Sequence, residues 1–298
     1  MRPHLHIIIP AYLNHKAKLK TLTATLSVLT SYPSCHSYVN LDPTSSPPLI
    51  TQLTQKFPSV NFFHLPFKGY AYVINSIYQQ ISLNITPHDY VGIINDDIYL
   101  KSCQPLIDLI TSQTNSDVIW PIVIENHTPI RGTKLHLLLH RALPTTYPHN
   151  LGPHGPIFFI KNATINKLIA QTGHFLNPTF DFFWEDIDLN LRLSLIKAKK
   201  TLISNWQVKH LHSQTIKHQS PKAKYYYYLN MLKFWYVWSS PFKFFLYHVP
   251  FILINQLYGL TINPPLFVRV WTTFLYSLPT LNRYPPHQRN LSKILTYT

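Results

Sequence analysis

Acidic residues and cysteine are scarce in this chain of 298 residues, which contains 11 Asp and Glu residues and two cysteines. Cys35 and Cys103 lie far apart and match no metal-binding or redox spacing, which excludes a disulfide framework and favours a reducing compartment. The apolar run near the N-terminus ends at Pro10 after a few residues, too short for a signal-peptide core. We therefore expect a cytoplasmic protein.

Acidic residues are absent altogether after Asp188. The chain beyond this residue holds 14 of the 26 Lys and Arg residues, and it carries almost all of the formal net charge of +15. Such a basic block could meet nucleic acid, the anionic face of a membrane or a phosphate-bearing substrate. Charge alone leaves these three partners open.

The acids that are present cluster in two places. Six of the 11 lie in two short windows, residues 95–97 and residues 181–188. A solvated surface would scatter its acids among its lysines, whereas a divalent cation and a general base both need anionic oxygen at fixed positions. The two windows therefore indicate a functional site.

Short apolar runs typical of β-strands alternate with helical patterns from the N-terminus to about residue 202. We expect strands at residues 5–9, 38–41, 60–65, 90–94, 118–124 and 157–160, and helices over residues 19–29 and 71–81. This alternation predicts an α/β domain with a mostly parallel sheet flanked by helices. Residues 126–156, rich in His, Pro and Thr, interrupt the alternation and are expected to form a long loop or insertion near the site.

The composition changes at Tyr225. The last 74 positions hold 20 of the 42 aromatic residues, and no formal charge occurs between Lys243 and Arg269. This stretch is long enough to span a membrane, but its prolines and polar residues favour helices that lie at the headgroup boundary or dock by apolar faces. The alternative is that it packs on the α/β core. We expect an α/β domain over residues 1–224 and a basic, aromatic helical extension over residues 225–298.

The first acidic window directly follows the strand expected at residues 90–94. Asp96 and Asp97 would thus lie at the carboxyl end of a strand, the edge at which open α/β sheets bind ligands. Carboxylate oxygens suit Mg²⁺ or Mn²⁺, which would neutralise charge on a substrate diphosphate. A simple turn is the alternative, because Asn and Asp are favoured in turns.

The second acidic window begins a helix in the predicted structure. Acids in a first turn are stabilised by the helix dipole, which gives Glu185 and Asp186 a purely structural alternative. Asp188 is expected to pair with Arg192 on the helix surface and to play a supporting role. The aromatic residues 182–184 are not explained by helix capping. Apolar neighbours raise the pKa of a carboxyl group toward that of a useful base.

These motifs resemble the nucleotide-sugar glycosyltransferases of family 2, in particular the rhamnosyltransferase-like bacterial members. The resemblance extends from about residue 5 to residue 238 and implies a GT-A fold. Residues similar to the nucleotide-sugar-binding positions of the family are Pro10, Ala11, Tyr12, Asp42, Lys68, Gly69, Asn75 and Asp96. Within this set the resemblance implies that Asp42 contacts a uracil or thymine base. Residues 68–75 would lie under the ribose and the diphosphate.

The acidic windows carry the catalytic part of the resemblance. The first window is similar to the metal motif of the family, which makes Asp97 the principal ligand of Mg²⁺ or Mn²⁺. The second resembles the acceptor-side Glu-Asp motif, which implies that Asp186 is the catalytic base, beside Glu185. His210 is similar to the histidine that completes the metal site, and His212 stays an alternative because it shares the same strand face.

The resemblance implies an inverting transferase that moves a hexosyl or rhamnosyl group from a UDP- or dTDP-activated donor. Its acceptor would be a lipid-linked or cell-surface glycan of cell wall polysaccharide biosynthesis, at the inner face of the cell membrane, with no nucleic acid as partner. One alternative is a noncatalytic basic module that binds nucleic acid or membrane through its last third. Another is a metal-dependent nucleotidyltransferase, although nothing in the chain resembles the Gly- and Arg-rich phosphate loop of such enzymes.

Overall fold

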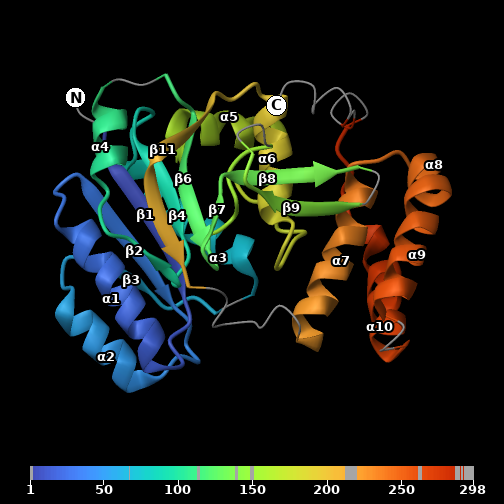
Figure 1. Ribbon diagram of the computed structural model, residues 1–298, viewed down its shortest axis with the longest axis horizontal. Helices are drawn as coiled ribbons and strands as arrows, with labels where there is room; N and C mark the ends of the chain where they lie inside the picture. Colours follow the sequence, from blue (N-terminus) through green and yellow to red (C-terminus); the bar gives the residue numbers. More distant parts are fainter. Residues whose placement is uncertain are drawn as a thin grey trace.

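A nine-stranded sheet organises the first two thirds of the chain (Figure 1). The computed structural model describes residues 3–66, 68–112, 115–137, 140–147, 151–211, 220–260, 264–285, 289 and 291. The sheet has the strand order β3-β2-β1-β4-β10-β6-β11-β5, and β7 pairs with β6. Its strands are β1 (Leu5–Ala11), β2 (Cys35–Leu41), β3 (Asn61–Phe63), β4 (Tyr90–Ile94), β5 (Ile98–Tyr99), β6 (Val118–Glu125), β7 (Thr128–Ile130), β10 (Ile157–Lys161) and β11 (Lys200–His210).

The strand directions confirm the prediction of a mostly parallel sheet. Strands β3, β2, β1 and β4 run parallel to one another, and β6 runs parallel to β11. Strand β10 is antiparallel to both β4 and β6 and so joins the two parallel groups. Every residue of β1 and β4 is buried, as expected for central strands covered on both faces. The carboxyl ends of the parallel strands therefore converge on one edge.

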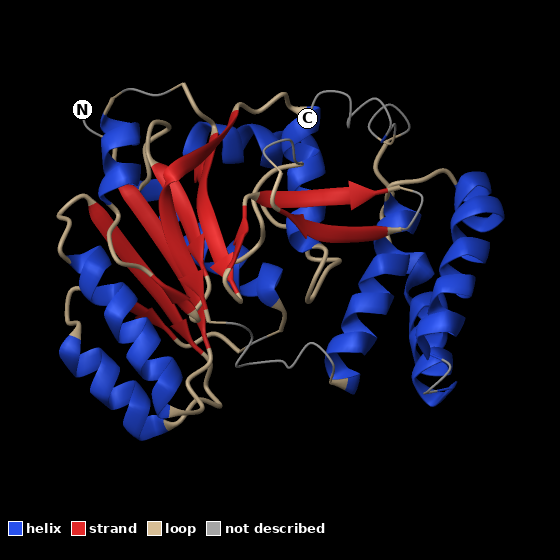
Figure 2. Ribbon diagram, in the orientation of Figure 1, coloured by secondary structure: helices blue, strands red, loops and turns tan. Residues whose placement is uncertain are grey.

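Helices cover both faces of this sheet (Figure 2). One face packs against α1 (Lys16–Thr30), α2 (Pro47–Lys56) and α4 (Gln104–Thr111). The other packs against α3 (Tyr70–Ile81), α5 (Asn162–Thr172) and α6 (Glu185–Leu195), and a short 3-10 turn, η1 (Ser82–Asn84), follows α3. The predicted α/β class with flanking helices is confirmed.

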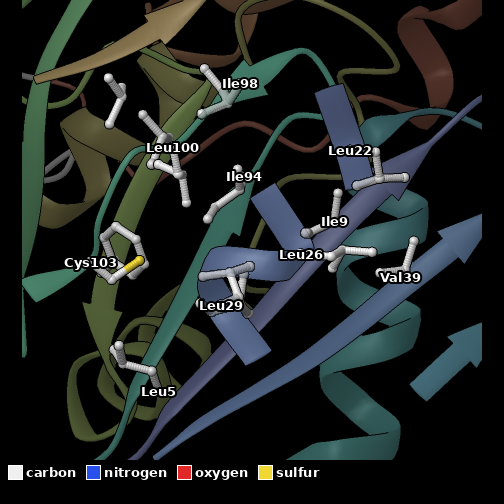
Figure 3. Packing of buried hydrophobic residues seen from close by; sticks show 14 of the residues in the cluster. Leu5, Ile9, Leu22, Leu26, Leu29, Val39, Ile94, Ile98, Leu100 and Cys103 are labelled. Carbon is white, nitrogen blue, oxygen red and sulfur yellow. The ribbon is translucent and has the colours of Figure 1, made fainter. Parts of the chain in front are cut away.

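The core beneath α1 shows how the sequence pattern fixes this packing (Figure 3). Leu22, Leu26 and Leu29 recur at helical spacing, and each is at most 1% exposed. They face Ile9 of β1 and Val39 of β2 in one apolar cluster. Burying a leucine side chain contributes roughly 1.5–3 kcal/mol. The helix is thus held on the sheet by its apolar stripe.

Residues 126–156, predicted as a long loop, contain regular structure instead. They include β7 and a two-stranded hairpin of β8 (Gly132–His136) and β9 (Arg141–Thr145). This hairpin leaves the sheet and reaches the C-terminal helices (Figure 1), where the His140 ring lies 4.6 Å from that of Trp235. The segment is an insertion that lines the cavity, as one of the two predicted forms had it. The other form, a long loop, was wrong because the short strands lack the apolar alternation of a buried sheet and gain their partners only from tertiary packing.

The C-terminal extension is a group of helices, as predicted. It comprises α7 (Pro221–Val237), α8 (Pro241–Lys243), the π-helical turn η2 (Phe244–His248), α9 (Val249–Leu260), α10 (Pro264–Ser277) and the 3-10 turn η3 (Leu278–Thr280). Leu229, Leu232 and Trp235 of α7 share one core with Trp184 and Ile187 of the α/β part. Within the described ranges, no helix is both long and apolar enough to cross a bilayer. The boundary at residues 224 and 225 stays a prediction.

Candidate active site

Both acidic windows line one cavity of about 480 Å³ at the carboxyl edge of the sheet. Its polar lining comes from Tyr12, Tyr70, Asn95, Asp96, Asp97, Glu125, Thr133, His154, Glu185, Asp186, His210 and Tyr227. Apolar lining comes from the hairpin, at residues 142–144, and from the aromatic residues 182–184. Among the described lining residues there is no Lys or Arg. This lining therefore holds five carboxyl groups and two imidazoles, besides three tyrosine hydroxyls.

Asp96 ties the first window to the end of β1. Its Oδ2 accepts hydrogen bonds from the backbone N–H of Tyr12 at 3.0 Å and from Lys18 Nζ at 2.9 Å. Burial raises the pKa of Asp96, and the neighbouring Lys18 ammonium opposes this rise. The Lys18 side chain is itself fully buried behind Asp96. Asp96 therefore fixes the β1–α1 turn at the cavity wall.

Asp97 faces His210, the residue that ends β11. His210 Nε2 lies 3.2 Å from Asp97 Oδ1, although this buried oxygen accepts no hydrogen bond from the described residues. Burial by itself would raise the pKa of Asp97, but the His210 imidazole outweighs burial and the pKa is lowered. In the absence of a cation the histidine pKa rises to about 9, because contact with two carboxylates outweighs its own burial, so a cation that binds Nε2 would displace a proton.

Glu125, the last residue of β6, holds the other side of His210. Its Oε1 accepts a hydrogen bond from His210 Nδ1 at 2.6 Å and lies 3.1 Å from His154 Nε2. The two histidines outweigh burial and lower the Glu125 pKa well below its usual range. Sequence reasoning missed both Glu125 and His154. The available signal was that Glu125, one of only two glutamates, directly follows the strand predicted over residues 118–124.

The second window enters α6 through a turn with left-handed backbone. Phe183 and Trp184 have φ values of 62° and 72°, a conformation that costs non-glycine residues about 1–3 kcal/mol each. Packing holds the turn in place, since the Trp184 ring is 2% exposed and lies 4.8 Å from the ring of Phe234. Glu185 and Asp186 follow at once and line the cavity.

Glu185 and Asp186 form a half-buried pair of carboxyl groups in the wall of the cavity. Burial, with a smaller contribution from Asp186, raises the Glu185 pKa to about 8. The Asp186 pKa is also raised by burial, but His154 and the backbone N–H groups of Ile187 and Gly155 favour its ionised form. A Cβ at Gly155 would lie 3.0 Å from Asp186 Oδ2, so a glycine lets this backbone approach the carboxylate. The larger rise for Glu185 favours this carboxyl group as the one that carries a proton at neutral pH.

Tyr70, which sequence reasoning also missed, connects the two windows. Its backbone N–H donates to the Asp181 carbonyl at 2.8 Å, and its hydroxyl donates to Asn95 Oδ1 at 2.6 Å. The preceding Gly69 has a φ of 117°, and a Cβ there would meet the Asp181 backbone at 3.0 Å. Burial, followed by the nearby carboxylates, raises the pKa of Tyr70 far above its usual value, so the hydroxyl remains a donor.

Asp188 has a structural role that differs from the predicted surface pair. It does bind Arg192, with 2.7 Å between Arg192 Nε and Asp188 Oδ2, but both side chains are fully buried. Trp238 Nε1 and the Tyr284 hydroxyl also donate to Asp188 Oδ1, each at 2.9 Å. The prediction of a surface location was wrong because the C-terminal extension covers this side of α6. Asp188 thus fastens the extension to the α/β part.

The predicted nucleotide-sugar-binding residues divide into two groups. Pro10, Tyr12 and Asp96 line the cavity, whereas Ala11, Asp42, Lys68, Gly69 and Asn75 lie outside its lining. Asp42 accepts a hydrogen bond from the Thr44 backbone N–H, and Asn75 bonds both backbone groups of Leu176. Their contacts with a nucleotide stay predictions. His212, the alternative to His210, lies outside the described residues.

The donor set fits a divalent cation that also binds a substrate. In the part of the chain that the structure describes, no three His, Cys, Asp or Glu side chains form a complete metal site. Asp97 Oδ1 and His210 Nε2 nevertheless face each other, and the former is a buried oxygen that accepts no hydrogen bond from described residues. Mg²⁺ is commonly held by one or two protein groups together with substrate phosphates and water. A partial protein site suits that mode of binding.

Comparison with known proteins places the fold. No protein-family model matches the chain, and no curated protein matches it in sequence. Among solved structures, the mannosyltransferase PcManGT from Pyrobaculum calidifontis, in complex with GDP-Man and Mn²⁺, superposes with a TM-score of 0.53. The comparison covers 100% of this chain and 85% of that one at 12% identity. The chain has a GT-A fold.

A second GT-A neighbour is S. aureus TarS, residues 1–349. It superposes with a TM-score of 0.52 at 14% identity, covering 93% of this chain and 81% of that chain. The same TarS fragment in complex with UDP gives a TM-score of 0.51 over 99% of this chain and 88% of that chain, again at 14% identity. The predicted GT-A sheet is confirmed at the level of fold.

Proposed function

We propose that the chain is an inverting, metal-dependent glycosyltransferase that uses a nucleotide-sugar donor. The observation that carries this proposal is the convergence of two acidic windows, about 90 residues apart in sequence, on one cavity. Asp97 and His210 line this cavity and would hold a cation. Asp186 and Glu185 line it as well and are the proposed base and its proton-bearing neighbour. These are the two chemical requirements of sugar transfer from a diphosphate.

The charge of the cavity supports a requirement for a cation. The donor diphosphate is anionic, and the described lining holds no Lys or Arg beside the carboxyl groups of Asp97, Glu125 and Asp186. Two like unit charges 4 Å apart repel by about 4 kcal/mol at an effective dielectric constant of 20. A bound Mg²⁺ or Mn²⁺ would neutralise the diphosphate and stabilise the charge that develops on the leaving nucleotide. Asp97 and His210 are the residues that would hold it.

Asp186 is the proposed general base. It would accept the proton of the acceptor hydroxyl as that oxygen attacks the anomeric carbon, and the nucleoside diphosphate would leave from the opposite face. Glu185 remains protonated at neutral pH, so it adds no second negative charge beside the base. A single displacement of this kind inverts the anomeric configuration.

We propose a UDP- or dTDP-linked hexose or rhamnose as donor and a lipid-linked or cell-surface glycan as acceptor. The UDP complex of the structural neighbour TarS supports a uridine donor, and the GDP-Man complex of PcManGT makes GDP-mannose the first competitor to test. The aromatic wall at residues 182–184 suits the apolar face of an acceptor sugar ring. The product would belong to cell wall polysaccharide biosynthesis.

Release of nucleoside diphosphate from a panel of UDP-, dTDP- and GDP-sugars tests this function. We expect release from one donor class, dependent on Mn²⁺ or Mg²⁺ and abolished by a chelator. Release of pyrophosphate from a nucleoside triphosphate would instead indicate a nucleotidyltransferase. If no donor is cleaved and no nucleotide binds with metal, the proposed function is wrong.

We further propose that the enzyme lies on the inner face of the cell membrane through its C-terminal helices. Among the residues that the structure describes, twelve large hydrophobic side chains are exposed, and eight of them lie there, namely Phe242, Phe245, Leu246, Tyr247, Ile254, Val268, Leu275 and Tyr276. This extension contains no acidic residue, so it suits an anionic surface. It lies at the opposite end of the molecule from α1 and α2 (Figure 1).

Sedimentation with vesicles that contain phosphatidylglycerol checks this placement. The triple variant Phe242→Ser/Leu246→Ser/Tyr276→Ser removes three exposed apolar anchors, and we expect it to lose most of the vesicle-bound fraction at high salt. Leu83→Ser is the matched control, because Leu83 is 93% exposed but lies on η1 of the α/β domain. Equal binding of the triple variant and the native chain would contradict the placement.

A further inference from the structure

Glu125 lines the cavity but has no role in the proposed mechanism. Strand β6 runs parallel to β11 with Ile124 opposite Lys209, which brings Glu125 beside His210 at the carboxyl ends of the two strands. On its other side His210 pairs with Ile98 of β5, directly after Asp97. The sheet register alone therefore places His210 between the two carboxylates.

The two ring nitrogens of His210 point to different partners. Nδ1 donates to Glu125 Oε1 at 2.6 Å, while Nε2 lies 3.2 Å from Asp97 Oδ1. These nitrogens lie on different edges of the imidazole ring. Asp97 and His210 Nε2 would therefore hold a cation together, whereas Glu125 contacts the other ring nitrogen and would not be a ligand of the same ion.

We propose that Glu125 is a positioning residue, which holds His210 with its proton on Nδ1 so that Nε2 faces Asp97 and the bound cation. The inference rests on the proposed function, since it concerns the same metal site. Metal-ligating histidines commonly donate their second ring N–H to a carboxylate, which fixes the tautomer and the ring orientation. In this chain the carboxylate is that of Glu125, at the end of the neighbouring strand β6.

A positioning residue must itself be held in place, and Glu125 is. Its side chain is 10% exposed, and His154 Nε2 lies 3.1 Å from the oxygen that binds His210. His154 Nδ1 in turn lies 3.4 Å from Thr133 Oγ1 of the hairpin. The residue after His154 is Gly155, whose backbone approaches Asp186. The segment that anchors Glu125 therefore also contacts the proposed base.

A double-mutant cycle on Mn²⁺ affinity tests the proposal. The dissociation constant of Mn²⁺ is measured by calorimetry with saturating UDP in the native chain, Glu125→Leu, His210→Ala and the double variant. We expect Glu125→Leu to raise the dissociation constant about 10–100-fold, and to add almost nothing once His210 is removed. Glu125→Gln keeps an oxygen acceptor for Nδ1–H, so its loss should be clearly smaller than that of Glu125→Leu.

The imidazole tautomer provides a readout that a merely structural role of Glu125 would not change. Nitrogen-15 NMR of the Mg²⁺ and UDP complex should show His210 protonated at Nδ1 in the native chain and in Glu125→Gln. If Glu125→Leu does not fold, Glu125→Gln decides the question by affinity: its amide oxygen is a weaker acceptor than the carboxylate, so the dissociation constant of Mn²⁺ should rise in Glu125→Gln and should rise no further in Glu125→Gln once His210 is removed. Protonation at Nε2 in the native chain would overturn the proposal.

The remaining outcomes separate this inference from the proposed function. If His210→Ala weakens Mn²⁺ binding but Glu125→Leu does not, or if Glu125→Leu has the same effect with and without His210, the role of Glu125 is wrong and the metal site stands. If the native chain binds no Mn²⁺ with UDP, or His210→Ala changes nothing, the metal site is wrong and the inference is overturned with it.

Discussion

Asp186→Asn should reduce kcat for sugar transfer by about 10²–10⁴-fold, the usual contribution of a positioned general base. The amide keeps the size of the side chain but cannot accept the proton of the acceptor hydroxyl. Binding of UDP with Mn²⁺ should stay within a few fold of the native value, because Asp97 and His210 are unchanged. Steady-state kinetics with the donor found in the panel, beside calorimetry with UDP, measures both effects.

Glu185→Gln is the matched control for Asp186→Asn. Both substitutions replace a carboxyl group of the cavity wall, in the first turn of α6, by an amide, but the glutamine resembles the protonated Glu185 that the cavity favours. We expect this variant to keep most of its activity. If Glu185→Gln loses as much activity as Asp186→Asn is expected to lose, Glu185 rather than Asp186 is the base.

Glu185→Gln also serves as the control for an expected dependence of kcat/KM on pH. The Glu185 pKa is raised to about 8, so the carboxyl group is protonated below this pH and becomes ionised above it. A second negative charge then lies beside Asp186 and the incoming diphosphate. In the native chain kcat/KM should therefore fall above about pH 8, and in Glu185→Gln this alkaline fall should be absent or moved to higher pH.

Asp97→Ala should lower kcat/KM by at least about 10²-fold and weaken Mn²⁺ binding in the presence of UDP. The substitution removes the buried oxygen that faces His210 Nε2. Without a firmly held cation, the donor diphosphate meets the remaining carboxylates of a lining that has no described Lys or Arg. Each pair of like unit charges left about 4 Å apart costs roughly 4 kcal/mol at an effective dielectric constant of 20.

Two control experiments test whether the effect of Asp97→Ala is specific to the metal site. Asp108→Asn changes an exposed acid on α4, far from the cavity lining, and should leave kinetics and Mn²⁺ binding unchanged. Raising the Mn²⁺ concentration should partly restore Asp97→Ala, since His210 and the diphosphate still provide ligands. Native kinetics in Asp97→Ala at low Mn²⁺ would contradict the proposed role of this residue.

Much of the fold could be predicted because its elements depend on local pattern. Strands β1 and β4 are continuous apolar runs, and the leucines of α1 recur at helical spacing. The hairpin of β8 and β9 could not be predicted, since its strands lie in a segment rich in His, Pro and Thr and its tip is held by distant aromatic residues. Short strands of this kind are defined by their neighbours rather than by their own propensity.

The candidate site, like the fold, could be predicted from the sequence only in part. The two acidic windows could be recognised because acids are so rare in this chain that their grouping is visible. Glu125 and Tyr70 stand alone in the sequence, and each joins the site through a partner 85 or 25 residues away. The sequence predicts a surface location for Asp188 because it shows the i, i+4 spacing to Arg192. It does not show that Trp238 and Tyr284 pack over Asp188 and donate hydrogen bonds to it.

The sequence by itself determined the α/β class, the helical C-terminal extension and the acids from which a site could be built. These features follow from composition and from spacing over a few residues. Only the tertiary structure decided which acids share one cavity, which of them are buried deeply enough to change their pKa, and that His210 stands between Asp97 and Glu125. Those properties depend on the register of β11 against β5 and β6. Strand register is set by packing across the whole sheet, and residues far apart in sequence determine it together.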